Sequence, residues 1–251
     1  MSAIATLEEQ LTQRTADLDA AKRDLEAFIY SVSHDLRAPL RTIDGFCRAL
    51  EEDYAGRVDE EGKDALRRVR VGAQQMAEQI DDLLKLSRVS RAEMAREPVD
   101  LSALARSIAN ELRAAAPERV VTFDIAPGLT ALGDRAMLDL LLRNLIGNAW
   151  KFTSRRASAR IEFGCVPTSG APAYFVRDDG AGFDMAEARR LFAPFQRLHG
   201  VRDFPGTGIG LAIARRIVER HGGDIWAEAA AAKGATFHFS LTAREAQCET
   251  V

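Results

Sequence analysis

The chain has 251 residues, and 34 Lys plus Arg against 37 Asp plus Glu give a formal net charge of −3. This balance excludes a strongly basic nucleic-acid-binding protein, and a hydrophobic content of 47% excludes wholesale disorder. Three cysteines cannot form a disulfide framework, and no apolar run approaches the ~20 residues of a membrane span. The N-terminus also lacks the pattern of a secretory signal. We therefore expect one or two globular domains in the cytoplasm, without membrane insertion.

The first segment carries a heptad repeat that is interrupted only by Arg14. Its apolar positions form two series, Ile4, Leu11, Leu18, Leu25 and Val32, and, three residues later, Leu7, Ala21 and Phe28. Five heptads predict a dimeric coiled coil. The alternative is a helix that packs against its own domain.

Two amphipathic helices are predicted next. Apolar residues continue from Leu40 to Leu50, the pattern breaks at 54–56, and a second stripe runs from Leu66 to Ser87. Each helix has more apolar surface than the other can cover, so we expect a helical hairpin that pairs with a second copy in a four-helix bundle. The polar residues 91–98, which end in proline, predict a linker.

From residue 99 the pattern is mixed, which makes the chain α+β. Helices are predicted at 101–115, 135–152, 185–191 and 209–221, and strands at 120–125, 159–166, 173–177, 224–229 and 235–241. The last residues predict a frayed tail.

Ser33-His34-Asp35-Leu36-Arg37-Ala38-Pro39-Leu40 is the first motif with chemical potential. If Val32 lies on the coiled-coil seam, His34 points to solvent, where an imidazole can act as a nucleophile. Asp35 can accept a hydrogen bond from the other ring nitrogen, and Pro39 predicts a kink just after the histidine. The alternative is an ordinary surface histidine.

Three further motifs lie in the mixed region. Asn144, Asn148 and Lys151 share one helix face, where amides and an ammonium suit Mg²⁺ and phosphates. The strand leading into Asp178-Asp179-Gly180-Ala181-Gly182 places a carboxylate where it can accept from an adenine amine. Gly206-Thr207-Gly208-Ile209-Gly210-Leu211 opens a helix, whose free amides bind phosphate. Taken separately, these motifs also fit a polar helix rim, an Asp-Gly turn and a plain glycine-rich loop.

In combination, the motifs resemble the transmitter of two-component sensor histidine kinases, most closely the phytochrome-like and PAS-linked branch. The phosphoacceptor box, the asparagine box, the two glycine boxes and a phenylalanine box at Leu191–Arg197 occur in the family's order. The resemblance covers residues 24–241. It implies a dimeric four-helix bundle joined to an α/β two-layer sandwich that binds ATP.

The resemblance also implies boundaries and roles. We expect a coiled-coil signalling helix at 1–23, a dimerisation and phosphotransfer domain at 24–90, a linker at 91–98, a catalytic domain at 99–242 and a tail at 243–251. The catalytic residues are expected to be His34, Asp35, Lys151 and Arg197. The expected ATP-binding residues are Asn144, Asn148, Lys151, Asp178, Gly180, Gly182, Phe192, Gly206, Thr207, Gly208, Gly210 and Leu211. Asn148 is expected to bind Mg²⁺, and 192–207 to form a lid.

The implied reaction is autophosphorylation of His34 by ATP, followed by transfer to an aspartate of a response-regulator receiver domain. An upstream sensor domain, absent here, or a partner is expected to supply the input. Two positions depart from the family pattern. Asp179 is a mild change, whereas Ala38 replaces the Thr or Asn of members with phosphatase activity, so we expect that activity to be weak. Two alternatives stay open: a docking scaffold with a dead nucleotide site, and an ATPase that works by conformational change.

Overall fold

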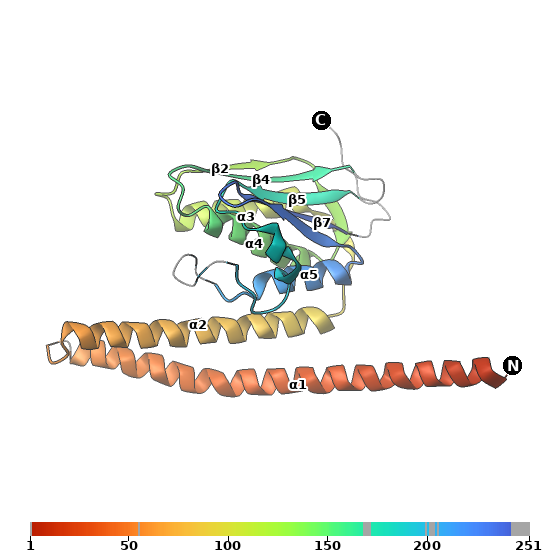
Figure 1. Ribbon diagram of the computed structural model, residues 1–251, viewed down its shortest axis with the longest axis horizontal. Coiled ribbons are helices and arrows are strands. Elements are labelled where there is room, and N and C mark those ends of the chain that lie inside the picture. The colour runs from red at the N-terminus through yellow and green to blue at the C-terminus, as the bar shows by residue number, and fades with distance from the viewer. Residues whose placement is uncertain are drawn as a thin grey trace. The chain divides into compact units, whose positions relative to one another are not determined.

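The computed structural model describes residues 2–54, 56–167, 172–198, 200, 204 and 206–241, and it divides into two compact units, Met1–Ser87 and Arg88–Val251 (Figure 1). The side chains of residues 2–9, 11, 12, 18, 19, 22–26, 28, 30 and 189 lie outside this description, as does the predicted tail at 243–251. No described helix combines the length and apolar character that a membrane crossing requires.

The first unit is the predicted helical hairpin. Helix α1 spans Ser2–Asp53 and α2 begins at Glu60 and ends at Arg91. Acidic residues occupy the first turn of α2 and basic residues its last turn, which complements the helix dipole. Leu40, Ala73 and Ile80 form the buried seam between the helices. Asp81 accepts from Arg37 across this seam.

The unbroken helix α1 agrees with the helix predicted from the heptads. Most of the heptad side chains, namely Ile4, Leu7, Leu11, Leu18, Leu25 and Phe28, lie outside the described side chains. The dimeric coiled coil therefore stays a prediction. Pro39 lies inside α1, and the bend expected at this proline also stays a prediction.

The predicted linker at 91–98 is too long. Helix α2 includes Arg91, and strand β1 (Glu97–Asp100) pairs antiparallel with β3 (Thr130–Gly133), so only residues 92–96 lack regular structure. Two four-residue strands are too short to show a recognisable alternation of apolar and polar residues. Pro98 also argues against a strand in the first of them, because proline is uncommon within strands. The last turn of α2 is held by α5 (Gly210–Arg220): Arg216 donates to the Ser90 hydroxyl and Arg220 to the Val89 carbonyl.

The second unit is a two-layer α/β sandwich. Its sheet has the order β2-β4-β5-β7-β6, with β2 (Val121–Ile125) parallel to β4 (Ala159–Val166) and the other pairs antiparallel. The remaining strands are β5 (Ala173–Asp178), β6 (Ile225–Ala229) and β7 (Ala235–Ser240). Helices α3 (Leu101–Ala115), α4 (Arg135–Phe152) and α5 cover one face of the sheet (Figure 1).

The helices begin where their sequences supply caps. Asp100 accepts from the Ala103 amide, and Asp134 accepts from the Met137 amide. Helix α4 is almost entirely apolar toward the sheet, and its leucines at 138, 141, 142 and 145 are fully buried. The helix predicted at 185–191 is instead a 3₁₀ turn, Met185–Arg190, because six residues are too few to sustain an α-helix.

His221, at the end of α5, links two parts of this core. Its side chain is 1% exposed; Nδ1 donates to the Ile217 carbonyl, and Nε2 accepts from the Asp134 amide at the start of α4. Accepting through Nε2 requires a neutral ring. Burial lowers the pKa of His221 below its usual value.

We predict that the stability of this unit falls as the pH drops through the unfolded-state pKa of about 6.5, because the unfolded histidine binds a proton that the folded one resists. His221→Leu should reduce the free energy of unfolding by about 1–3 kcal/mol at pH 8, since it leaves the Asp134 amide unpaired. The difference from the wild type should shrink at pH 5. Urea unfolding followed by tryptophan fluorescence measures both; a pH-independent difference would contradict the assignment.

Candidate functional site: a nucleotide pocket and an exposed histidine

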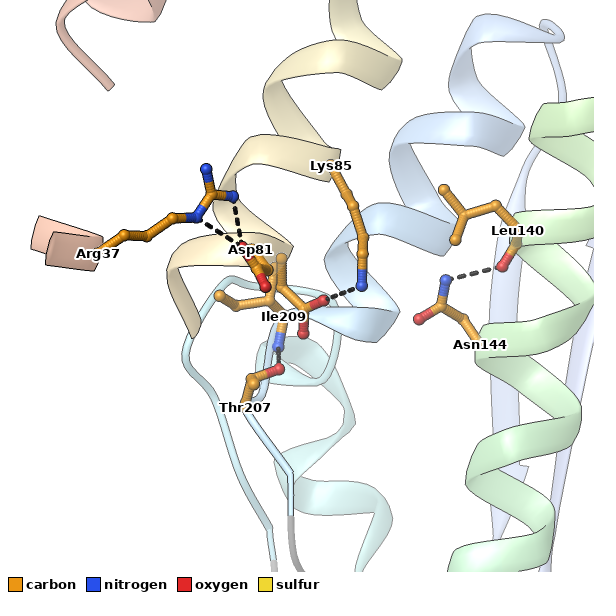
Figure 2. Close-up of polar contacts among 8 residues, drawn as sticks. Arg37, Asp81, Lys85, Leu140, Asn144, Thr207 and Ile209 are labelled. Carbon is orange, nitrogen blue, oxygen red and sulfur yellow. Dashed lines mark hydrogen bonds and ion pairs between the residues drawn. The ribbon is translucent and has the colours of Figure 1, made fainter. Parts of the chain in front are cut away.

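The phosphoacceptor motif lies on α1. The His34 side chain is 73% exposed, and Asp35 Oδ1 lies 3.2 Å from its Nδ1. A carboxylate can only accept, so in the neutral form of the ring this contact places the proton on Nδ1 and leaves the lone pair on Nε2. The exposure and the Asp35 partner predicted from sequence are both confirmed. Figure 2 shows the neighbouring Arg37–Asp81 contact, which joins this part of α1 to α2.

Helix α4 presents the predicted polar face. Asn144, Asn148 and Lys151 are all half-buried. Asn144 Nδ2 donates to the Leu140 carbonyl at 2.7 Å, as Figure 2 shows, and its Oδ1 lies close to Gly210. No protein group within the described ranges bonds to the Asn148 side chain. Its amide oxygen therefore remains available to a hard cation.

Lys151 meets the second glycine motif. Its Nζ lies 4.3 Å from the centroid of the Phe152 ring and 3.1 Å from where a Cβ on Gly206 would sit. Burial, and then the charge of Arg197, lower the pKa of Lys151 to about 8. An ammonium that is partly removed from solvent is stabilised by an anionic ligand.

The first glycine turn places a carboxylate at the end of β5. Asp178 is 5% exposed and accepts from the Gly180 amide at 2.9 Å. Burial raises the pKa of Asp178 to about 6. A buried carboxylate with a raised pKa is a marked binding-site feature.

The same turn is pressed against the end of α4. The Ala181 amide donates to the Phe152 carbonyl, and a Cβ on Gly180 would lie 2.5 Å from that oxygen. Gly182 adopts φ +60, and a side chain there would collide with the Ala230 carbonyl. These positions require glycine for close approach.

Asp179, the departure from the family pattern, contacts Arg156, whose Nε lies 3.9 Å from Oδ1 of Asp179. Its Oδ1 accepts from the Arg160 amide on β4 at 3.1 Å. The substitution therefore anchors the turn to the sheet and leaves Asp178 in place.

The second glycine motif opens α5 beneath a loop. Gly208 has φ +76, and a Cβ on Gly210 would lie 2.6 Å from Asn144 Oδ1. The Ile209 amide donates to Thr207 Oγ1, as Figure 2 shows. Leu211 and Phe192, which were also predicted to contact ATP, are half-buried. Within the predicted lid, residues 199, 201–203 and 205 lie outside the described residues.

Arg197 bonds to backbone rather than standing free. Its Nη1 donates to the Gly206 carbonyl at 2.5 Å and its Nη2 to the Phe204 carbonyl at 2.6 Å. The predicted contact of Arg197 with a γ-phosphate would require at least one of these bonds to be exchanged.

Sequence reasoning missed an aromatic contact at the base of the lid. Phe204 is 4% exposed, packs edge-on against Phe152 with centroids 5.0 Å apart, and lies under the Arg155 guanidinium. These residues border a pocket of about 330 Å³. Its lining is Phe152, Arg155, Arg156, Gly180, Ala181, Phe204 and Ala232. Phe204 lies in no motif, and a lone aromatic residue in a loop gives no sequence signal.

The structure thus gathers the glycine motifs, Asp178, Asn144 and Lys151 around one side of the second unit. His34 and Asp35 belong to the first unit. The described residues contain no cluster of three or more His, Cys, Asp or Glu side chains suited to a metal.

Two family models match the chain in the order of the two units. The His Kinase A (phospho-acceptor) domain matches residues 24–92, and the "Histidine kinase-, DNA gyrase B-, and HSP90-like ATPase" model matches residues 133–245. The chain belongs to the family of sensor histidine kinase transmitters. Its ATPase-type domain is of the kind that binds ATP, and the predicted fold of helical hairpin plus α/β sandwich is confirmed.

Similar proteins agree with this assignment. Cyanobacterial phytochrome B of Nostoc sp. is 36% identical over 93% of this chain, which covers 31% of that protein. The methanogenesis regulatory histidine kinase FilI of Methanothrix harundinacea is 33% identical over 92% of the chain, which covers 26% of FilI. The chain thus spans about a third or less of these relatives. The solved structure of full-length ShkA in complex with AMPPNP matches 86% of the chain and 46% of ShkA with TM-score 0.61 at 27% identity.

We predict that Asp178→Asn weakens ATP binding at least about tenfold at pH 7.5, because the variant loses one of the two accepting oxygens and the charge with which Asp178 is expected to bind the adenine amine. The free energy of unfolding should change by no more than about 1 kcal/mol, since removal of a buried charge offsets the lost acceptor. Calorimetric titration and urea unfolding measure the two quantities.

Asp179→Asn is the matched control, because it removes a carboxylate from the same turn while its amide oxygen can still accept from the Arg160 amide. It should leave ATP affinity within about twofold of the wild type. An equal loss of affinity in both variants would contradict the role given to Asp178.

Proposed function

We propose that the chain catalyses ATP-dependent phosphorylation of His34 and passes the phosphoryl group to an aspartate of a response-regulator receiver domain. The observation that carries this proposal is the presence in one chain of an exposed, Asp35-oriented imidazole and of two glycine motifs that closely approach Asp178, Asn144 and Lys151. Belonging to the histidine kinase family supports the same reaction.

In the proposed step, the lone pair of His34 Nε2 attacks the γ-phosphorus of ATP. The bond between that phosphorus and the bridging oxygen breaks, and ADP leaves. The ring then carries a positive charge, which Asp35 stabilises or removes by taking the Nδ1 proton. The geometry supports this choice of nitrogen, because Nδ1 already faces the Asp35 carboxylate.

The pocket residues would hold ATP by complementary chemistry. Asp178 would accept from the adenine amine, while Lys151 and Asn144 would face the phosphates together with the backbone at Gly206, Gly208 and Gly210. The positions where a Cβ would collide, on Gly180 and Gly210, leave room only for backbone. We further propose that Arg197 and Phe192 act from the lid, which excludes water from the reacting phosphate.

The residues fit a magnesium ion that is bound jointly by the protein and the nucleotide. Asn148 offers one hard, neutral oxygen without a protein partner among the described residues, which is the ligand type that Mg²⁺ accepts alongside phosphate oxygens. When bound, the ion would neutralise charge on the triphosphate.

The hairpin surface supports a homodimer as the working unit. Leu36, Ile43 and Leu50 on α1 repeat every seven residues and are 47%, 39% and 41% exposed. Val69 and Met76 on α2 show the same spacing and are 50% and 49% exposed. Apolar stripes of this length are buried when two hairpins form a four-helix bundle. A cytoplasmic location and an upstream sensor domain or partner are part of the same proposal.

Incubation with Mg²⁺ and γ-labelled ATP tests the function. We expect an acid-labile, alkali-stable label on the wild type, since a phosphoramidate hydrolyses in acid, and none on His34→Ala. His238→Asn is a control for labelling of another histidine and should label normally. Absence of label despite ATP binding would favour an ATPase that works by conformational change, and absence of both would favour a docking scaffold.

The phosphatase activity is predicted to be weak because Ala38, four residues after His34, has no group to orient a water molecule. Ala38→Thr should speed dephosphorylation of a receiver domain that has been labelled by this kinase. The decay is timed with and without each variant in the absence of ATP. Decay that wild-type protein already accelerates strongly would contradict the prediction.

A further inference from the structure

The C-terminal turn of α4 is held from outside the helix by one arginine. The last carbonyls of a helix have no partner within it. Arg119, which precedes β2, donates from Nη1 to the Trp150 carbonyl at 2.9 Å and from Nη2 to the Thr153 hydroxyl at 3.2 Å. The same guanidinium lies 4.0 Å from the centroid of the Trp150 ring. Arg119 therefore contacts a single helical turn in three ways.

The other side of this helical turn is held by the first glycine turn. The Phe152 carbonyl accepts from the Ala181 amide of the first glycine turn. Thr153, which is fully buried, closes the helix through its amide and hydroxyl on the Ala149 carbonyl. Lys151 thus lies between two residues whose carbonyls are held by groups far apart in sequence.

We propose that Arg119 is a positioning residue for the phosphate-binding side of the pocket and that it acts through Lys151, an inference that rests on the proposed function. A helix end without its caps frays, and fraying here would release the peptides on either side of Lys151. The positive charge of Arg119 also faces the negative end of the helix dipole. Because this turn is fixed, the Nζ of Lys151 is held close to Gly206.

The contrary explanation is that Arg119 merely stabilises the fold. Four side chains stack in a column, in the order Arg119, Trp150, Phe123 and Arg113. The ring centroids of Trp150 and Phe123 are 5.9 Å apart, and the Arg113 guanidinium lies 4.8 Å from the Phe123 centroid. Arg113 shares the column and its charge, but the described contacts do not join it to the end of α4. Arg113→Ala is therefore the matched control for loss of the stacking alone.

Calorimetric ATP titration of the full chain in Mg²⁺ tests the inference as a double-mutant cycle. Arg119→Ala should raise the dissociation constant about tenfold in the wild-type background and less than about twofold in a Lys151→Ala background. Arg113→Ala should change it less than about twofold. Arg119→Lys, which keeps the charge but loses the planar fork, should recover only part of the affinity.

A pH profile gives a readout that a purely structural role would not move. Wild-type affinity should fall around pH 8 as Lys151 loses its proton. In Arg119→Ala or Arg119→Lys, Lys151 gains solvent and the midpoint should move to higher pH. Equal losses in both backgrounds, or an unchanged midpoint, would overturn the inference. If the wild type itself does not bind ATP, the proposed function fails instead.

Discussion

The contact between the end of α4 and the first glycine turn is the constraint on which the candidate site depends. The Phe152 carbonyl and the Ala181 amide meet because Gly180 has no side chain to hold them apart. One partner continues from Asp178 at the end of β5, and the other follows directly on Lys151. This single approach of backbone to backbone therefore sets the spacing between a buried acid and a buried base.

The folded protein disfavours the charged form of both side chains, Asp178 and Lys151. Burial raises the pKa of Asp178 to about 6 and lowers the pKa of Lys151 to about 8, so each resists its charged form. Stability of the empty fold is reduced at both positions. A ligand that carries an amine at one end and a polyanion at the other would stabilise the charged form of both side chains, in agreement with the proposed nucleotide site.

Much of the fold and the site follows from local sequence. Helices 101–115 and 135–152 and strand 159–166 have the predicted limits, because a regular spacing of apolar residues over a long segment can be recognised in the sequence alone. The glycines can be recognised in the sequence because close backbone approach requires that residue type. Asp178 can be recognised because it is a carboxylate at the end of a strand. The strands at 97–100 and 130–133, the Phe204–Phe152 contact and the role of Arg119 cannot be recognised in this way, since each depends on partners brought together only by the tertiary fold.

The boundary between the two units falls inside α2, between Ser87 and Arg88, and not in a loop. Val89 and Ser90 are already bonded to α5 through Arg220 and Arg216. The units are thus joined by a stretch of helix, which resists twisting far more than an irregular linker would. A change in their mutual orientation must bend or unwind a hydrogen-bonded turn.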